Sequence, residues 1–332
     1  MFQRRLLRPL FLFVSTIVVV ALCIVSFIRL PYETRAYVFK QGPITSCTFE
    51  KDIPNIVHLV YILKDPIQGD FPLQFSQFLS IYALSKRWQP DAIYLHTNAE
   101  ADGGSNGKHI KMLEHKSDFA RVKAVHDFGG IYVDLDVHAL QDINPVHEAG
   151  YRAVVGRQLG GDLQSGSFMS EKGGRLVKEW MERMHEVYDG RWITHSNKLL
   201  TTVGEELVNT GPCEVLIMGR DAWAPGGWVR DDTERLYGEH DDVESNIAGL
   251  KQGDSLPEHD DMDGYDRPEW AFDYSCTYLL HAFSLEKPRD GVKHNRITPK
   301  YVLERRSNFG RAVYSIAKEL YDKGIITIDE TL

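Results

Sequence analysis

The sequence predicts an α/β fold with a mostly parallel sheet, and two observations support this prediction. Short runs rich in β-branched and aliphatic residues alternate along the chain with longer segments whose apolar residues recur at helical spacing. The chain has 332 residues, 43% hydrophobic and 26% charged, which excludes a disordered, collagen-like or disulfide-scaffold protein. Because strands separated by helices usually pair in parallel, helices should cover both faces of the sheet.

The expected elements follow one another in a regular order. In residues 71–88, apolar side chains recur every three or four positions, which predicts a helix that ends before Pro90. Another helix should begin at Ser117 and end at Gly129 and Gly130. Strands are expected at residues 53–62, 92–97, 131–137, 153–158, 166–170 and 215–218, and further helices at 179–188, 197–208 and 308–321.

An uncharged segment near the N-terminus predicts a membrane anchor. As a helix rising ~1.5 Å per residue, Leu10–Ile28 would span about 28 Å, which suits a thin bilayer. This apolar core is longer than that of a cleaved signal peptide, and the flanking arginines favour a short cytoplasmic N-terminus. We therefore expect a cytoplasmic tail at residues 1–9, a transmembrane signal-anchor helix at 10–28, a stem at 29–52 and a lumenal domain at 53–332.

Acidic residues dominate the chain beyond the expected anchor. The whole chain has a net charge of −9; residues 1–30 hold four arginines and no acid, so the remaining 34 basic and 47 acidic residues leave −13. Thirteen of the acids lie within Asp231–Asp266, which we interpret as a long surface insertion. This charge balance argues against nucleic acid as a partner.

The cysteines leave disulfide pairing open. Cys23 lies in the expected anchor, and Cys47, Cys213 and Cys276 lie beyond it. A bridge between Cys213 and Cys276 is one option in an oxidising lumen, but the sequence does not assign it. No cysteine spacing suggests a zinc site.

A pair of carboxylates carries the first chemical signal. Asp134 and Asp136 are two residues apart, so on an extended strand both would point to the same side. Two like charges cannot lie in a strand interior without a counter-charge, so the pair should lie at a strand end or bind a cation. Hard divalent ions such as Mg²⁺ or Mn²⁺ bind carboxylates together with phosphate oxygens.

The helix before this pair adds a second signal. Asp118 and Arg121 are neighbours on one helix face. Gly129 and Gly130 permit a tight turn from that helix directly into the acidic strand. The helix face, the turn and the acid pair are thus coupled within one short stretch of chain.

The pattern Ser-Asp-x-x-Arg, followed by Gly-Gly-Ile-Tyr-x-Asp-x-Asp-Val, resembles the sugar-binding DXD region of glycosyltransferase family 32, including its fungal α-mannosyltransferase-like members. Weaker similarity runs from Ile53 to about Phe283, through Thr210–Pro212 and Tyr278–His281. The resemblance implies a GT-A-type nucleotide-sugar-binding sandwich and a retaining, metal-dependent hexosyltransferase. It would take a GDP- or UDP-sugar as donor, Mn²⁺ or Mg²⁺ as cofactor, and a glycan, glycoprotein or glycolipid as acceptor. With the anchor, it implies a single-pass type II protein of the Golgi or ER membrane.

The resemblance also implies roles for particular residues, although it names no catalytic group. Asp136 would bind the metal directly, Asp134 would contact the ribose or the metal, and His281 would be a further ligand. Contacts to the donor sugar and nucleotide would come from Ser117, Asp118, Arg121, Gly130, Tyr132, Asp134 and His58.

Several candidates have plain structural alternatives. His58 lies in the first expected strand and His281 in an apolar run, where histidines often serve packing alone. Trp223 and Trp228 are candidates for a sugar-stacking loop, or ordinary loop anchors. Acceptor contacts are expected at Gln164 and Ser165, although the family pattern has Asn where Gln164 stands.

Two other functions stay open at this point. The segment between Thr97 and Ser117 is short and glycine-rich where relatives carry another strand, which favours a non-catalytic sugar- or nucleotide-binding relative. A hydrophobic strand followed by Asp-x-Asp-Val also resembles the nucleophile motif of haloacid-dehalogenase-like phosphatases. That alternative leaves the Ser-Asp-x-x-Arg pattern unexplained.

Overall fold

The computed structural model describes residues 47, 53–63, 73–97, 110, 112–259, 267–283 and 297–329. All of them belong to one structural unit, Ser46–Leu332. The expected tail and anchor, and the expected stem apart from Cys47 itself, lie outside the described residues. Among the helices that are described, none is long and apolar enough to cross a bilayer.

A six-stranded sheet forms the centre of this unit, with the strand order β2-β1-β3-β6-β5-β7. The strands are β1 (Ile56–Tyr61), β2 (Ala92–Thr97), β3 (Gly130–Val133), β5 (Ala153–Arg157), β6 (Leu163–Ser170) and β7 (Leu216–Met218). Neighbouring strands pair in parallel except where β6 meets β3 and β5, so β6 alone runs against the other strands. The predicted α/β fold with a mostly parallel sheet is confirmed.

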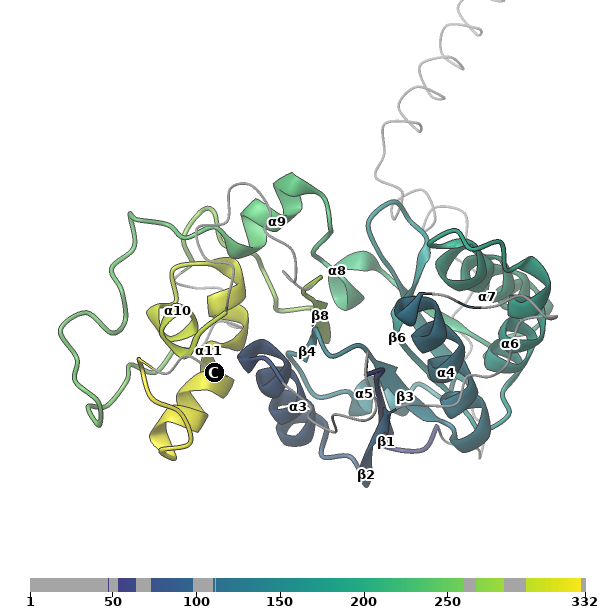
Figure 1. The fold of residues 1–332 in the computed structure, drawn as a ribbon, viewed down its shortest axis with the longest axis horizontal. Coiled ribbons are helices and arrows are strands. Elements are labelled where there is room, and N and C mark those ends of the chain that lie inside the picture. The colour runs from purple at the N-terminus through teal and green to yellow at the C-terminus, as the bar shows by residue number, and fades with distance from the viewer. Residues whose placement is uncertain are drawn as a thin grey trace, which may run out of the picture. The chain divides into compact units, whose positions relative to one another are not determined.

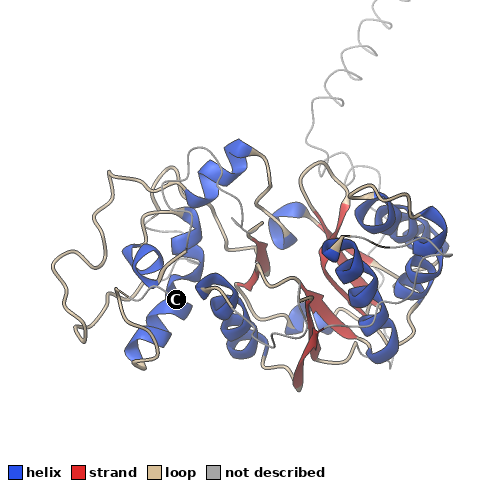
Figure 2. Cartoon of the chain, in the orientation of Figure 1, coloured by secondary structure: helices blue, strands red, loops and turns tan. Residues whose placement is uncertain are grey.

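Helices cover both faces of the sheet, as predicted. They are α3 (Phe75–Trp88), α4 (Leu113–Phe128), α5 (Asn144–His147), α6 (Arg175–Val187), the π-helix η1 (Thr194–Lys198), α7 (Leu199–Thr210), α8 (Arg220–Trp223), α9 (Arg230–Tyr237), α10 (Pro299–Glu304) and α11 (Asn308–Asp322). Figure 1 shows α4, α6 and α7 together on one side of the sheet and α3, α10 and α11 on the other. Figure 2 shows the strands as the layer between them.

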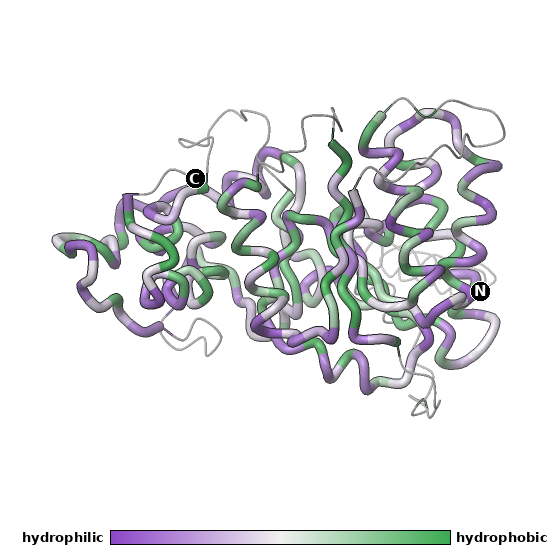
Figure 3. The backbone as a smooth tube through the Cα atoms, turned by 60° about the horizontal axis from the view of Figure 1, so that its bottom comes forward, coloured by the Kyte–Doolittle hydropathy of each residue, from purple (hydrophilic) through white to green (hydrophobic). Residues whose placement is uncertain are grey.

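Side-chain alternation along the strands produces two hydrophobic cores. In β3, Ile131 and Val133 join the core that contains α3 and α11, whereas Tyr132 joins the core that contains α4, α6 and α7. Both faces of β3 are therefore fully buried, as expected for a strand in the middle of a covered sheet. The strands are largely hydrophobic in Figure 3, while the helices alternate between hydrophobic and hydrophilic residues.

A separate pair of short strands brings distant parts of the chain together. β4 (Val137–Ala139) pairs antiparallel with β8 (Leu279–His281), and Val137 lies opposite His281. The backbone N–H of Ala282 also donates to the carbonyl of Asp136 at 2.9 Å. This pairing fixes His281 beside the acidic segment that precedes β4.

Two elements around the acid pair differ from the sequence prediction. The helix α4 begins at Leu113, not at Ser117, because Met112 occupies the N-cap without offering the side-chain signal that marks a helix start. The strand predicted at 131–137 is broken, since β3 ends at Val133 and a turn precedes β4.

The acidic segment predicted as a surface insertion is partly structured. Its described part begins in α9, and Leu236, Tyr237, Ile247 and Leu256 are buried in the first core. The sequence missed these anchors because isolated apolar residues among many acids have no clear period.

The glycines before β3 have a specific steric role. Gly129 ends α4, donating its N–H to the carbonyl of Val125 at 2.8 Å, and has a φ of +71°. Gly130 has a φ of +110°, and a Cβ there would lie 2.4 Å from the carbonyl oxygen of Ile56. The predicted tight turn is confirmed, and no other residue type fits it without moving β1.

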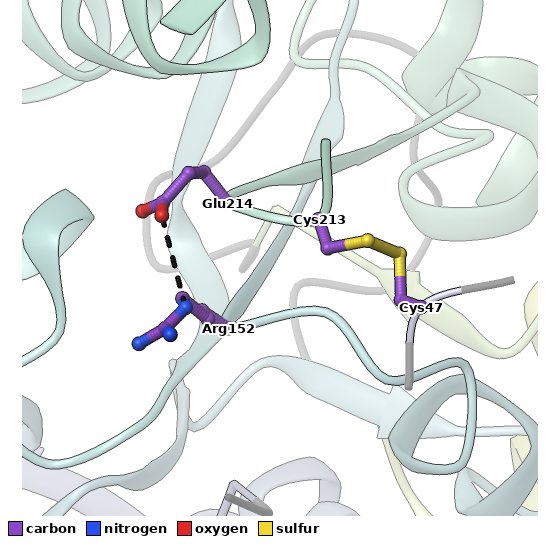
Figure 4. Close-up of a disulfide and its surroundings, with 4 residues drawn as sticks. All are labelled: Cys47, Arg152, Cys213 and Glu214. Atoms are coloured by element: carbon purple, nitrogen blue, oxygen red, sulfur yellow. Dashed lines mark ion pairs between the residues drawn. A yellow bond between two sulfur atoms is a disulfide. The ribbon is translucent and has the colours of Figure 1, made fainter. Parts of the chain in front are cut away.

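A disulfide joins Cys47 to Cys213, while Cys276 is exposed and has a free thiol. The option of a Cys213–Cys276 bridge is therefore wrong. Figure 4 shows the bridge beside Arg152 and Glu214, whose Nε and Oε1 atoms lie 3.7 Å apart. The bond attaches the chain just before the domain to the loop that precedes β7.

Candidate active site

The acid pair lies in a tight turn at the carboxyl end of β3. The N–H of Val137 donates to the carbonyl of Asp134 at 3.0 Å, which closes the turn. The N–H of Asp134 donates to the carbonyl of Gly166 in β6 at 2.7 Å, so the turn is also fixed to the sheet. The prediction that the acids lie at a strand end is confirmed, and ligands typically bind at this end of parallel strands.

Three potential metal ligands converge on this turn. Asp134, Asp136 and His281 each offer a ligand atom, and these atoms lie within 4.8 Å of one another. The Nε2 atom of His281 is 3.3 Å from Oδ1 of Asp136. The carboxylates are half-buried and the imidazole is buried. Two carboxylates and one imidazole form a donor set that suits Mn²⁺ and related divalent ions.

Gln164 orients the imidazole of His281. Its Nε2 atom donates to the hydroxyl of Ser167 at 2.7 Å, which leaves Oε1 to accept from Nδ1 of His281, also at 2.7 Å. With the proton on Nδ1, the Nε2 atom of a neutral His281 presents a lone pair towards Asp136. A lone pair facing a carboxylate favours a cation, so the local hydrogen bonding fits a metal ion.

The electrostatics of His281 point the same way. Burial lowers the pKa of His281, but the negative charges of Asp136 and Asp134 act in the opposite direction, and the net effect is a raised pKa. Gly166 allows β6 to pass close to the site, because a Cβ there would lie 2.7 Å from Oδ2 of Asp134 and 2.8 Å from Cε1 of His281. The surroundings therefore favour positive charge at this point.

Arg121 links the helix to the acidic turn. Its Nη2 atom is 3.3 Å from Asp118 Oδ1 and 3.3 Å from Asp134 Oδ1. The guanidinium also donates to the carbonyl of Ser165 at 3.1 Å and to the hydroxyl of Ser117 at 3.1 Å. Burial lowers the pKa of Arg121, but the carboxylates of Asp134 and Asp118 more than offset this, and the pKa is raised. Arg121 is thus a permanent buried cation.

Tyr132 supports Asp134 from the strand below it. Its hydroxyl donates to Oδ1 of Asp134, and the guanidinium of Arg121 lies 4.8 Å from its ring centre. Burial raises the pKa of Asp134, and the charge of Asp136 raises it further, while Arg121 acts against both. The Tyr132 ring is wholly buried, so it holds Asp134 in place without an exposed surface of its own.

Asp118 faces a second partner from a distant helix. Its Oδ2 atom is 3.0 Å from Nε2 of His195 in η1, a residue that is fully buried. Two residues further along η1, Oδ1 of Asn197 accepts from the hydroxyl of Ser165 at 2.9 Å. Neither His195 nor Asn197 was among the predicted site residues. No local pattern in the segment Trp192–Leu200 indicates a contact with α4.

Some predicted site residues lie elsewhere or have other roles. His58 bonds through Nε2 to the carbonyl of Gly129 at 2.8 Å and through Nδ1 to His96 at 2.9 Å, so it holds the turn before β3. Gly130 belongs to that same turn. The imidazole of His58 and Gly130 thus lie at the start of β3, whereas Asp134 follows its end, and their donor contact stays a prediction.

Two of the predicted acceptor-side residues, Gln164 and Trp223, are buried in this structure. Gln164 is fully buried, and its amide is hydrogen-bonded to His281 and Ser167. Trp223 is also fully buried, and its indole N–H donates to the carbonyl of Ser167 at 3.2 Å. Trp228, by contrast, is 42% exposed and lies 5.5 Å, centre to centre, from the ring of Phe283. Trp228 therefore stays a candidate for sugar stacking.

Part of the chain is similar in sequence to known proteins. Residues 70–152 match the family described as a glycosyltransferase sugar-binding region containing a DXD motif. The chain is 22% identical over 217 residues to glucan organizing enzyme 1 of Cryptococcus neoformans var. grubii, covering 56% of this chain and 57% of that protein. The chain thus matches little more than half the length of this curated relative.

Solved glycosyltransferase structures show weaker likeness. The apo form of GlyE from Streptococcus pneumoniae TIGR4 is 11% identical with a TM-score of 0.41, covering 82% of this chain and 64% of that one. Mouse xyloside xylosyltransferase 1 is 12% identical with a TM-score of 0.34, covering 53% and 88%. The matched segment 70–152 contains Asp118, Arg121, Asp134 and Asp136. This segment is thus similar to the sugar-binding region of the DXD-containing glycosyltransferases, in agreement with the resemblance found in the sequence.

Proposed function

We propose that the protein is a retaining glycosyltransferase that moves a hexose from a GDP- or UDP-sugar to a glycan, glycoprotein or glycolipid. The observation that carries this proposal is the convergence of Asp134, Asp136 and His281 next to the Asp118–Arg121 pair. The first group suits a divalent cation, and the second suits sugar hydroxyls. Together they supply what the transfer of a sugar away from a diphosphate requires.

The metal side would hold Mn²⁺ or Mg²⁺ through Asp136, Asp134 and His281. When bound, such an ion neutralises the negative charge that develops on the leaving nucleoside diphosphate. Gln164 keeps Nε2 of His281 directed to the ion, and Tyr132 keeps Asp134 in place. A cation would also relieve the repulsion between the two carboxylates.

The sugar side would bind the donor hexose. The carboxylate of Asp118 is an acceptor for sugar hydroxyls, while Arg121 and Ser117 offer donors on the same helix face. Arg121 also contacts Asp134, so it lies between the proposed sugar and phosphate positions. In this arrangement the guanidinium of Arg121 would contact both the sugar and the leaving diphosphate.

The acceptor would approach beside Trp228. Phe283 stacks on His281 with ring centres 3.9 Å apart, and Trp228 lies against Phe283. Exposed aromatic rings next to a metal site provide an apolar surface on which a sugar ring can stack. Trp228 is therefore the acceptor-side residue that we propose.

We also propose a lumenal location, in a single-pass type II protein of the Golgi or ER membrane. The uncharged segment Leu10–Ile28 supports the anchor, and it lies outside the described residues. The Cys47–Cys213 disulfide supports an oxidising compartment, where such bonds persist.

A panel of nucleotide sugars, assayed for transfer and hydrolysis with Mn²⁺, tests the proposed activity. We expect turnover of at least one GDP- or UDP-hexose, and its loss in Asp136→Ala. No turnover of any donor, or turnover unchanged in Asp136→Ala, would refute the proposal. Release of phosphate from a phosphomonoester, with a trapped phosphoryl-aspartate at Asp134, would instead support the phosphatase alternative.

A non-catalytic sugar- or nucleotide-binding function is the second candidate. It is favoured by β2, the edge strand of the described sheet, whose Tyr94 and Leu95 side chains are 43% and 42% exposed. The family resemblance predicts a further strand after Thr97, and residues 98–109 lie outside the described part. Binding of a nucleotide sugar without any turnover would decide for this candidate.

A further inference from the structure

One turn of π-helix brings a buried histidine to the sugar side of the site. The element η1 separates α6 from α7, and π-helical turns are rare and often found at functional sites. The indole of Trp180 donates to the carbonyl of His195 at 3.0 Å, which fixes the backbone of this turn. His195 itself is fully buried and reaches Asp118, a residue 77 positions earlier in the chain.

The hydrogen bond defines the state of the His195 ring. Oδ2 of the Asp118 carboxylate is an acceptor, so Nε2 of His195 must carry the proton that joins them at 3.0 Å. The other oxygen of Asp118 is 3.3 Å from Arg121. With one partner on each oxygen, the carboxylate cannot rotate, and its remaining lone pairs point in fixed directions.

Packing alone does not explain a histidine at this position. The ring stacks on Phe119 at 5.5 Å between centres and also contacts the rings of Tyr188 and His115. A phenyl ring would fill this aromatic cluster equally well. The imidazole instead leaves Nδ1 buried without a hydrogen-bond partner in the described structure, which costs free energy. The bond to Asp118 is what the imidazole adds.

We infer that His195 is a positioning residue, which holds Asp118 in the orientation that accepts a hydroxyl of the donor sugar. This inference rests on the proposed function of Asp118 as a sugar contact. Since Asp118 would contact the sugar and not the diphosphate, loss of His195 should weaken binding of a nucleotide sugar while sparing the nucleoside diphosphate. A purely structural role would weaken both ligands alike or neither.

His115 provides a matched control within the same cluster. It is also buried, with its ring centre 4.6 Å from that of His195. Its Nδ1 atom bonds to the hydroxyl of Tyr188 at 3.1 Å, and among the described residues it makes no hydrogen bond to the carboxylates of the site. Replacing either histidine by phenylalanine thus perturbs the same core, but only one replacement removes a hydrogen bond from Asp118.

The experiment compares His195→Phe, His195→Gln and His115→Phe with the wild type in the presence of Mn²⁺. Calorimetry measures the Kd for UDP-glucose and GDP-mannose, and for UDP and GDP alone, and thermal melting monitors folding. For the sugar nucleotide that binds the wild type, we expect His195→Phe to weaken affinity by ~10-fold to 100-fold. The affinity for the matching diphosphate should stay within about twofold.

The two other variants complete the test. His195→Gln should recover most of the affinity for the sugar nucleotide, because its amide N–H can donate to Asp118. His115→Phe should change the affinities for the sugar nucleotide and for the diphosphate by the same factor. The inference is overturned if His195→Phe weakens both ligands equally, or neither, while still melting cooperatively. If the wild type binds no sugar nucleotide, the proposed function fails first and this inference fails with it.

Discussion

The two sides of the candidate site differ in how their charges are balanced. On the sugar side, Asp118 is held between Arg121 and His195, with one partner on each oxygen. On the metal side, Asp134 and Asp136 face each other and His281, and their mutual repulsion contributes to the raised pKa of Asp134 after the effect of burial. The sugar side is thus complete in the protein alone, whereas a divalent cation would complete the metal side.

This difference predicts which part of the donor each side of the site should bind, the sugar or the diphosphate. A preorganised carboxylate binds a neutral hydroxyl without rearrangement, which favours discrimination among sugars. A cluster that gains a cation favours a doubly charged phosphate ligand. Changes on the metal side should therefore affect diphosphate binding and turnover, and changes on the sugar side should affect sugar selectivity and folding.

The largest effect is expected on the metal side. Asp136→Ala removes a proposed ligand, so we expect turnover to fall by at least ~10²–10³-fold, with diphosphate affinity falling too. Initial rates with the donor selected from the panel, across a Mn²⁺ titration, measure this loss. Asp127→Ala is the control, because Asp127 forms an exposed pair with Lys123 on α4 and should leave the rate unchanged. Equal losses in both variants would contradict the assignment.

A large effect on folding is expected on the sugar side. Arg121→Met leaves the buried carboxylate of Asp118 without its cation, which should lower the free energy of unfolding by ~3 kcal/mol. Urea denaturation monitored by tryptophan fluorescence measures the change. The variant of Asp136 should lose far less stability, or even gain some, since it removes one of two repelling charges. A larger loss of stability in Asp136→Ala than in Arg121→Met would contradict the difference between the two sides.

A smaller effect should follow from the residue that orients His281. Gln164→Leu keeps the buried volume similar but removes the acceptor for Nδ1, so we expect the affinity for Mn²⁺ to fall by ~10-fold to 100-fold. Calorimetric titration of the metal-free protein with Mn²⁺ measures this affinity directly. The Asn variant, whose amide is one methylene shorter, should show an intermediate loss. Unchanged Mn²⁺ binding in Gln164→Leu would mean that His281 is not a ligand.

The smallest effect is expected at His58, whose imidazole lies at the start of β3 and which belongs to neither the sugar side nor the metal side of the site. Burial lowers the pKa of His58, with an opposing contribution from its bond to Gly129 and a further lowering by His96. The unfolded chain therefore binds a proton that the folded chain resists, and stability should fall as the pH drops below about 6.5. For His58 alone the loss between pH 7.5 and 5.5 should not exceed about 1.4 kcal/mol.

Urea unfolding of His58→Gln at these two pH values checks this expectation. The stability of the variant should decline less steeply with falling pH than that of the wild type, because the variant lacks a histidine whose pKa is lowered by folding. Part of the decline should remain in the variant, since burial also lowers the pKa of His96 and of His115. A steeper decline in the variant would contradict the assigned sign.

Local sequence signals predicted most of the fold and half of the site. Strand β2 was predicted from the strand propensity of its residues, and the turn at Gly129 from the conformational freedom of glycine. Both effects act over only a few residues. The proposed ligands Asp134 and Asp136 were found because their spacing has a chemical meaning without tertiary context.

What the sequence could not give depends on long-range packing. Nothing local connects His195 with Asp118, which meet because η1 lies against α4. Burial likewise distinguishes Trp223, the last residue of α8, from Trp228 in the segment that follows, because the first is buried and the second is exposed. Gln164 looked like an acceptor contact because the sequence does not reveal that its amide faces His281.

The central claim is that Asp134, Asp136 and His281 bind a divalent cation that a nucleoside diphosphate requires. Calorimetric titration of UDP and GDP into the metal-free protein, with and without Mn²⁺, tests this claim most directly. We predict that one of the two diphosphates binds at least ~10-fold more tightly with Mn²⁺, and that Asp136→Ala abolishes the difference. Equal affinity with and without Mn²⁺ in the wild type would contradict the claim.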